Sequence, residues 1–301
     1  MNSLDYKLVH ALDVVIKEQH FEKAAEKLNI TQSAVSQRIK QLEQQVAQPV
    51  LIRSQPLVAT RVGQALLRHY RQVKQLEIEL IEQLFIEKKS QVTTVPIALN
   101  ADTLASWFIP ALVPVLKSNA VQLDLQVCNE SRTQELLKKG EVYAALSCQK
   151  KSFSGCKTQY IGEISYILCA TSAFKQQYFS KGINRQTLKY APSVVFDPQD
   201  TMHIEYMKTH YQLNSTDYPY HIMRSSEAFV SMALAGVAYC LLPETQANVY
   251  LESGELLDIA PKKHLQHKLY WHSWVLERGL FKQISTAIVQ YGRQLLANHE
   301  Q

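Results

Sequence analysis

Apolar residues recur with a helical period between Leu8 and Leu28. Two stripes follow the i, i+3, i+4, i+7 spacing of an amphipathic helix, and a short polar break separates them. The stripes are Leu8, Ala11, Leu12 and Val15, followed by Phe21, Ala24, Ala25 and Leu28. The small side chains of the alanine pair favour a close crossing of two helices. The pattern predicts a bundle of short helices at the start of the chain.

A third helix is predicted after a break at Asn29-Ile30. Thr31 is a good N-cap, because its hydroxyl accepts a free backbone N–H of the next turn. The apolar face of this helix carries Val35, Ile39 and Leu42, and the opposite face carries Gln32, Ser33, Ser36, Gln37, Arg38 and Lys40. Amides and hydroxyls reach base edges in a major groove, and Lys or Arg reaches phosphate, so the polar face is typical of DNA reading. A solvated face of a helical bundle is the alternative.

A short hairpin is predicted next. The apolar pair Val50-Leu51 and the turn at Pro56 form a wing that places Arg53 for contact with phosphate. Thr60 then caps a long helix over residues 62–87.

That long helix carries an apolar seam. Leu66, Val73 and Leu80 are spaced by heptads, with Leu76 between them. The seam predicts a dimer, which would present two recognition helices to half-sites related by a two-fold axis; a tetramer is left open. Packing of the seam against its own domain is the alternative.

From Val92 onward, short apolar runs alternate with helical stretches. This alternation predicts an α/β fold with mostly parallel sheets, long enough for two subdomains. The predicted strands are 96–100, 121–127, 143–148, 165–170, 193–196, 221–225, 238–242 and 269–275. On such sheets, ligands bind at the carboxyl ends of strands, close to helix N-termini.

Polar clusters follow four of these predicted strands. They contain Asn100, Asp102 and Thr103; Glu130 and Ser131; Asp197, Asp200 and His203; and Ser225 and Ser226. Each cluster alone is typical of a helix cap. Together they suit a small molecule of mixed charge, because hydroxyls and helix N-termini hold a carboxylate while Asp or Glu holds an ammonium or guanidinium group.

Charge is distributed unevenly along the chain. Residues 1–74 hold 11 Lys/Arg against 6 Asp/Glu, and the rest holds 21 of each, so the whole net charge of +5 lies in the first quarter. A small basic module joined to a neutral one is the expected result. Five scattered cysteines without a C-x-x-C pair predict reduced thiols and no metal site. A polar N-terminus and the lack of a long apolar run predict a cytoplasmic protein.

The first 85 residues carry motifs of a known family. The stretch FEKAAEKLNITQSAVSQRIKQLEQQVAQPVLIR, followed by TRVGQALL, resembles the winged helix-turn-helix and linker helix of LysR-type transcriptional regulators. Ser33 stands where many members have proline. The resemblance implies a DNA-binding domain at 1–60, a linker and dimerisation helix at 61–90 and an effector-binding domain at 91–301. The residues expected to contact DNA are Thr31, Gln32, Ser33, Ser36, Gln37, Lys40 and Arg53.

The remainder is similar to the branch of this family that responds to arginine and lysine. The segments NADTLASWFIPAL, RTQELLKKGEV, DPQDTMH, SSEAFV and LYWH carry this similarity. It implies two Rossmann-like halves of periplasmic-binding-protein type, about 91–163 with 270–301 and about 164–269, with chain crossings near 161–165 and 265–270. It also implies lysine or arginine as effector, no other cofactor, and control of genes for the export or synthesis of basic amino acids. We expect Asp102 and Glu130, with Asp197 or Asp200, to meet the cation, and the serines at 225 and 226 to meet the α-carboxylate.

Other functions fit the sequence less well. An enzyme would show a motif such as G-x-S-x-G, a P-loop, G-x-G-x-x-G or H-E-x-x-H, and the sequence has none of these. A nutrient-binding protein would need an export signal and would not need residues 1–90. A sequence-neutral DNA binder would gain little from the amides of Gln32 and Gln37. We therefore expect a promoter-binding regulator that contacts RNA polymerase; a LysR-type regulator of another small metabolite is the alternative.

Overall fold

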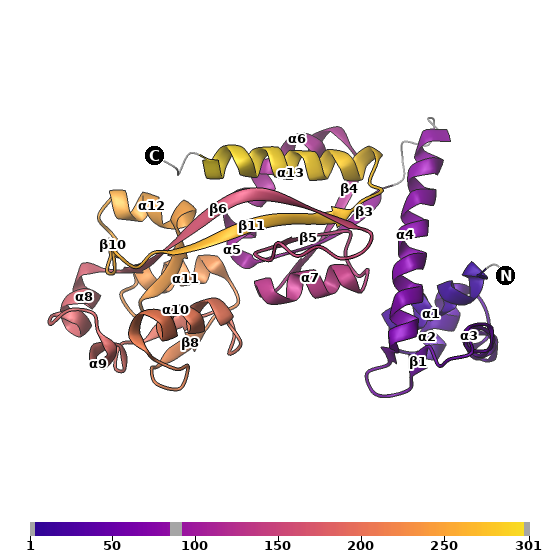
Figure 1. The fold of residues 1–301 in the computed structure, drawn as a ribbon, viewed down its shortest axis with the longest axis horizontal. Coiled ribbons are helices and arrows are strands. Elements are labelled where there is room, and N and C mark those ends of the chain that lie inside the picture. The colour runs from indigo at the N-terminus through magenta and orange to yellow at the C-terminus, as the bar shows by residue number, and fades with distance from the viewer. Residues whose placement is uncertain (1–3, 85–91, 298–301) are drawn as a thin grey trace. The chain divides into compact units, whose positions relative to one another are not determined.

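The structure, a computed structural model, describes residues 4–84 and 92–297 (Figure 1). Its chain divides into two units. The first comprises Met1–Gln91 with Leu136–Tyr143, and the second comprises Val92–Glu135 with Ala144–Gln301.

The first unit is built from helices with a small hairpin. Its elements are α1 (Tyr6–Glu18), α2 (Phe21–Leu28), α3 (Gln32–Val46), β1 (Leu51–Ile52), β2 (Val58–Ala59) and α4 (Arg61–Leu84). The side chains of Asp5, His20 and Thr31 accept backbone N–H groups at the starts of the first three helices. Each of these helices ends on a residue in the left-handed conformation, which stops the helix and redirects the chain.

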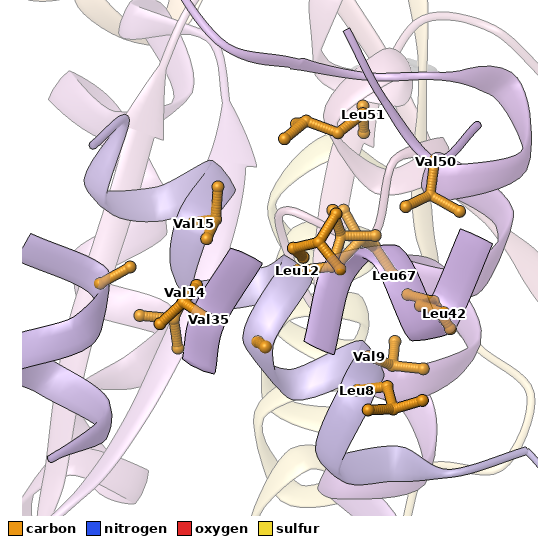
Figure 2. Packing of buried hydrophobic residues seen from close by; sticks show 14 of the residues in the cluster. Leu8, Val9, Leu12, Val14, Val15, Val35, Leu42, Val50, Leu51 and Leu67 are labelled. Atoms are coloured by element: carbon orange, nitrogen blue, oxygen red, sulfur yellow. The ribbon is translucent and has the colours of Figure 1, made fainter. Parts of the chain in front are cut away.

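The predicted apolar stripes form the core of this unit (Figure 2). The first stripe, the alanine pair and the apolar face of α3 are buried, and Phe21 and Leu28 pack against them. Val50 and Leu51 of the hairpin and Leu67 of α4 join the same cluster. The start of α4 is thus part of the core of the first unit.

The second unit alternates strands and helices. Its elements are β3 (Thr93–Leu99), α5 (Ala101–Thr103), α6 (Ile109–Ser118), β4 (Val121–Val127), α7 (Glu130–Lys138), β5 (Ala144–Ser147), β6 (Cys156–Ala170), α8 (Ser172–Phe179), α9 (Arg185–Leu188), β7 (Ser193–Val195), α10 (Thr201–Tyr211), β8 (Tyr220–Ile222), α11 (Ser226–Leu234), β9 (Cys240–Pro243), α12 (Glu244–Glu252), β10 (Leu257–Asp258), β11 (Leu265–Trp274) and α13 (Gly279–Ala297). A π-helical turn, Leu104–Phe108, joins α5 to α6.

A mixed sheet organises the second unit. Its strand order is β10-β6-β11-β5-β3-β4, and β9 also pairs with β6. Strand β3 runs parallel to β4 and β5, whereas β11 runs antiparallel to β5 and β6. A separate parallel pair, β7-β8, is linked to Tyr239 beside β9 through a bridge at Ser193.

The prediction of mostly parallel sheets is wrong, and the reason lies in β6 and β11. Both strands are longer than predicted and run side by side across the unit (Figure 1). Strand β6 carries the chain from one half, which contains β3 to β5, to the other half, which contains β7 to β10, and β11 carries it back. Strands that lead out and return run in opposite directions, so this pair is antiparallel.

Helix α13 packs closely on β6. A Cβ at Gly162 of β6 would lie 2.6 Å from the Cβ of Leu296, and a Cβ at Gly292 of α13 would lie 2.5 Å from Cγ2 of Ile161. Side chains at these two positions would push the helix off the strand, so glycine is required by the close approach.

Candidate nucleic-acid interface and small-molecule pocket

Helix α3 presents the polar face that the sequence predicts. Val35, Ile39 and Leu42 are fully buried, while Gln32, Ser33, Gln37 and Lys40 are exposed and Ser36 is half-buried. Thr31 caps the helix by accepting the N–H of Ala34 at 3.2 Å, and its hydroxyl lies 2.9 Å from that of Ser33. The Ser33 position thus extends the cap, and the fold tolerates serine there. The face that remains open is polar, has no acid and begins at a helix N-terminus, which favours phosphate.

The hairpin holds Arg53 beside the first turn of α2. Strands β1 and β2 pair antiparallel, and Arg53 is exposed with its guanidinium 5.6 Å from the centre of the Phe21 ring. Gln19, at the end of α1, bonds both backbone groups of Leu57, with its amide oxygen 2.7 Å from the N–H and its amide nitrogen 3.1 Å from the carbonyl. The wing is therefore anchored to the helices, and a cation–π contact orients its arginine.

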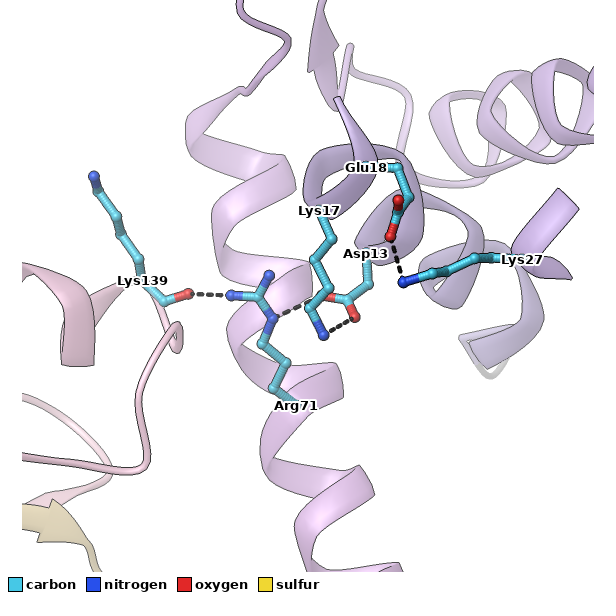
Figure 3. Close-up of polar contacts among 6 residues, drawn as sticks. All are labelled: Asp13, Lys17, Glu18, Lys27, Arg71 and Lys139. Carbon is cyan, nitrogen blue, oxygen red and sulfur yellow. Dashed lines mark hydrogen bonds and ion pairs between the residues drawn. The ribbon is translucent and has the colours of Figure 1, made fainter. Parts of the chain in front are cut away.

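A buried carboxylate joins α1 to α4. Asp13 of α1 lies 2.7 Å from Nε of Arg71 on α4 and 2.9 Å from Nζ of Lys17 (Figure 3). Burial raises the pKa of Asp13, but the two cations outweigh it and hold the pKa below the ordinary 3.8. Asp13 is therefore ionised near neutral pH and fixes α4 to α1.

The predicted seam on α4 divides into two parts. Leu66 packs against the core of its own unit, and Val73 and Leu76 are half-buried. Leu80 and Ile81, nearer the C-terminal end, are about half exposed. The first part of the seam therefore packs within its own unit, as the alternative reading expects, while the dimer predicted from the seam stays a prediction.

The second unit contains a pocket between its two halves. One wall follows β3 and β4, and the other follows β7 and includes the start of α11 and part of β9. The lining residues are Asn100, Ala101, Asp102, Cys128, Asn129, Phe196, Asp200, Met202, Ser226, Phe229 and Leu241. The ends of β3, β4 and β7 and the start of α11 therefore converge on this pocket. Apolar side chains line the pocket together with the polar groups.

Asp102 accepts hydrogen bonds from two hydroxyl groups, one on the opposite wall of the pocket and one on β6. Its Oδ1 accepts from Ser226 Oγ at 2.6 Å, and its Oδ2 accepts from the buried Tyr166 hydroxyl at 3.0 Å. Asp200 has a different environment, since its two oxygens accept the N–H groups of Phe196 and His203. Asp200 is thus committed to backbone groups, including the cap of α10, while Asp102 is bonded by side-chain hydroxyl groups.

Four of the predicted effector residues with described side chains line this pocket: Asn100, Asp102, Asp200 and Ser226. Asn100 also caps α5 by accepting the N–H of Thr103 at 3.3 Å. Four others have side chains placed elsewhere, namely Thr103, Asp197, His203 and Ser225. The side chains of Glu130 and Ser131, at the start of α7, lie outside the described part of the structure.

The four predicted residues outside the pocket lining are buried or cap local structure. Thr103 is fully buried, and His203 stacks on Tyr239 with ring centres 6.3 Å apart. Burial lowers the pKa of His203 to about 4, so this imidazole is neutral. Asp197 accepts the N–H of Gln199, and the hydroxyl of Ser225 caps α11 and donates to Glu227.

Several lining residues were not predicted. Cys128, Phe196, Met202, Phe229 and Leu241 are apolar or nearly so, and an apolar residue beside a strand gives no signal that separates pocket from core. Asn129 lies two residues after the end of β4, and its amide donates to the carbonyl of Gln199 at 3.2 Å across the pocket. Its position after a strand, like that of Asn100, was the available signal.

A winged helix-turn-helix joined to a two-lobed α/β domain with an internal pocket defines a ligand-responsive DNA-binding regulator. Residues 6–64 match the family "Bacterial regulatory helix-turn-helix protein, lysR family", and residues 95–274 match the "LysR substrate binding domain". The chain belongs to the LysR family of transcriptional regulators, as predicted. Among the described residues, no helix is long and apolar enough to cross a membrane.

Named relatives span almost the whole chain. The "HTH-type transcriptional regulator ArgP" of Aeromonas salmonicida is 50% identical over 296 residues, which cover 98% of this chain and 99% of the relative. The ArgP of Vibrio vulnificus (strain CMCP6) is 47% identical, covering 97% and 98%. Two solved structures are similar: ArgP from Mycobacterium tuberculosis (30% identity, TM-score 0.84, covering 96% and 98%) and full-length LysG from Corynebacterium glutamicum with bound effector Arg (28%, 0.80, covering 97% and 99%).

Proposed function

We propose that this regulator senses arginine and lysine in the pocket of its second unit. The observation that carries the proposal is Asp102, a carboxylate on the pocket wall that accepts hydrogen bonds from the hydroxyl groups of Ser226 and Tyr166. An ammonium or guanidinium group makes a stronger, charge-assisted bond with such a carboxylate. Asp200 adds negative charge on the opposite wall, and the related LysG was solved with arginine bound.

The other end of the effector needs a positive environment. Helix α11 begins at Ser226 on the pocket wall, and the free N–H groups of a helix N-terminus favour a carboxylate. The apolar lining of Phe196, Phe229 and Leu241 suits the methylene chain between the charged ends.

Calorimetry on the full-length protein tests the effector class. Arginine and lysine should bind, while citrulline and norleucine, which keep the size without the side-chain cation, should bind at least tenfold more weakly. Asp102→Asn should weaken arginine binding by a similar factor. If arginine and lysine fail to bind at millimolar concentration, the assignment is wrong and the alternative, another small metabolite, takes its place.

For DNA, we propose that α3 reads sequence and the wing holds the backbone. Gln32, Ser33, Ser36 and Gln37 are assigned to base edges, whereas Thr31, Lys40 and Arg53 are assigned to phosphates. Gln32→Ala should relax sequence preference at one base position. Arg53→Ala should weaken binding to all sequences and reduce the slope of log K against log salt by about 0.9. Equal effects of the two variants would contradict this division.

We further propose that the protein acts in the cytoplasm as a dimer or tetramer on promoter DNA and alters recruitment of RNA polymerase. The exposed Leu80 and Ile81 on α4 support self-association. Leu80→Glu should shift the sedimentation profile toward monomer and weaken binding to a two-half-site promoter, while binding to a single half-site changes little. An unchanged profile would place the oligomer contact elsewhere.

A further inference from the structure

The hydroxyl of Ser226 lies between two acceptors. Its Oγ is 2.6 Å from Asp102 Oδ1 and 2.7 Å from Oε1 of Gln246 on α12. A serine hydroxyl carries one proton and therefore donates to one oxygen at a time. The carboxylate is the stronger acceptor, so the hydroxyl donates to Asp102 Oδ1, and Gln246 Oε1 is the alternative acceptor.

This contact also closes the pocket. Asp102 belongs to the wall that follows β3, and Ser226 belongs to the opposite wall. The cavity between the walls has a volume of about 40 Å³, whereas pockets for small molecules enclose about 300–1,000 Å³. An amino acid can enter only if the walls separate, and separation breaks the bond between Ser226 and Asp102.

Tyr166 lies behind the same carboxylate and has a different role. It is fully buried on β6, the strand that links the two halves, and donates to Asp102 Oδ2 at 3.0 Å. It therefore keeps Asp102 oriented when the opposite wall moves. One carboxylate oxygen stays held by Tyr166, and the other is the one that Ser226 occupies.

We propose that Ser226 is an internal competitor of the effector. Its hydroxyl donates to Asp102 Oδ1 until the cationic group of the effector takes its place, and the same hydroxyl then donates to Gln246 Oε1. The exchange makes effector binding and separation of the walls a single event, and Gln246 stabilises the displaced serine. This inference rests on the proposed basic amino-acid effector, since it names the group that the effector must displace.

An internal competitor raises the apparent dissociation constant. If the bond between Ser226 and Asp102 is formed about nine-tenths of the time, the apparent Kd is about tenfold above the intrinsic one. Ser226→Ala removes the competitor and should lower the Kd of the full-length protein for arginine and lysine about tenfold. A residue that only contacts the effector would do the opposite, because its removal weakens binding.

Gln246 provides the second variant. Gln246→Leu keeps the size of the side chain and removes the acceptor for the displaced hydroxyl, so the Kd should rise about fivefold. In a Ser226→Ala background no hydroxyl needs that acceptor, and Gln246→Leu should then change the Kd by less than about twofold. Ser231→Ala is the matched control, because Ser231 lies on the same helix and bonds the carbonyl of Glu227; it should leave the Kd unchanged.

Titration calorimetry of wild type, both single variants and the double variant decides between the outcomes. Tighter binding by Ser226→Ala, together with a Gln246→Leu effect that disappears in the double variant, supports the exchange. Weaker binding by Ser226→Ala, or a Gln246→Leu effect that persists without the serine, overturns it. If wild type binds neither arginine nor lysine, the proposed effector class fails instead, so the two failures are distinguishable.

Discussion

Removal of the Arg71 charge should destabilise the first unit of the protein. Asp13 has 3% of its side chain exposed, and Arg71 has 16% exposed, so the pair between α1 and α4 is largely shielded from water. Leaving a buried charge without its partner costs about 3–5 kcal/mol, and because Lys17 remains beside Asp13 we expect about 3 kcal/mol for Arg71→Met. Methionine keeps the apolar stem of arginine, so the loss reports the charge, with the hydrogen bond to the Lys139 carbonyl, and not the packing.

The matched controls replace lysines that lie on the same two helices but have exposed side chains. Lys17 is 58% exposed, and Lys17→Met should cost less than about 1 kcal/mol, as exposed ion pairs do. Lys74→Met, at an exposed position on α4, should stay within about 0.5 kcal/mol of wild type. Asp13→Leu combined with Arg71→Met should recover most of the loss, because replacing both partners leaves no charge in the core.

The same pair predicts a pH effect with a defined sign. The folded pKa of Asp13 lies below 3.8, so its contribution is complete above pH 3.8 and is lost as the pH falls through the folded value. Without Arg71 the folded pKa of Asp13 rises. Acid unfolding of the first unit should therefore begin at a higher pH in Arg71→Met than in wild type.

Two probes separate the units in the full-length protein. The three tryptophans, Trp107, Trp271 and Trp274, all belong to the second unit, so their fluorescence reports that unit alone. Hydrogen exchange of amides in α1 to α3 reports the first unit. Arg71→Met should speed exchange in α1 to α3 and leave the tryptophan transition in place. A cost below about 1 kcal/mol, or a double variant no more stable than Arg71→Met, would refute the inference that this pair fixes α4 to α1.

Two further predictions concern packing and protonation. A Cβ at Gly63 would overlap the carbonyl oxygen of Val50, so Gly63→Ala should lower the thermal midpoint of the first unit and weaken DNA binding. Lys74→Ala, at an exposed position on the same helix, should do neither, and an unchanged melting curve of Gly63→Ala would show that the backbone yields there. His272 is fully buried between Gln134 and Thr158, and burial lowers its pKa to about 4. In the unfolded chain His272 binds a proton below about pH 6.5, so the free energy of unfolding of the second unit should fall by about 3 kcal/mol between pH 6.5 and 4. Urea titrations of His272→Gln should show a smaller dependence on pH.

The first unit was predictable from sequence because its structure is set by local pattern. The stripe from Leu8 to Val15, the cap at Thr31 and the polar face of α3 are properties of single helices, and each is confirmed. Thr60 also caps α4 as predicted, accepting the N–H of Gly63 at 3.1 Å. Asp13 escaped notice, because one acid within an apolar stripe gives no sign of a partner 58 residues away.

The second unit was predictable only in part, since its pairing is set by long-range contacts. Strand β4 has its predicted bounds, while only the end of β6 was predicted. The first part of β6 contains three consecutive polar residues, Lys157 to Gln159, and gains its strand partner from β11, far along the chain. The pocket shows the same limit, because the strand-end rule found Asp102 and Ser226 but could not find Tyr166, which lies within β6.

The long strand pair suggests where the two halves of the second unit can move. The register of β6 against β11 shifts between Leu269 and Tyr270, opposite Gly162 and Ile161. Helix α13 packs on this same stretch through its contacts at Gly292 and Leu296, which hold the first half rigid there. Beyond the shift, on the side of Tyr166, β6 pairs with β9 and packs against α12, so the shift separates the part of β6 that packs on α13 from the part that packs on the other half. Tyr166 lies on β6 and donates a hydrogen bond to Asp102 of the first half. Effector binding at Asp102 and the angle between the halves are therefore both linked to β6. A ligand can change that angle only by the difference in its affinity for the two arrangements, and the exchange at Ser226 supplies such a difference.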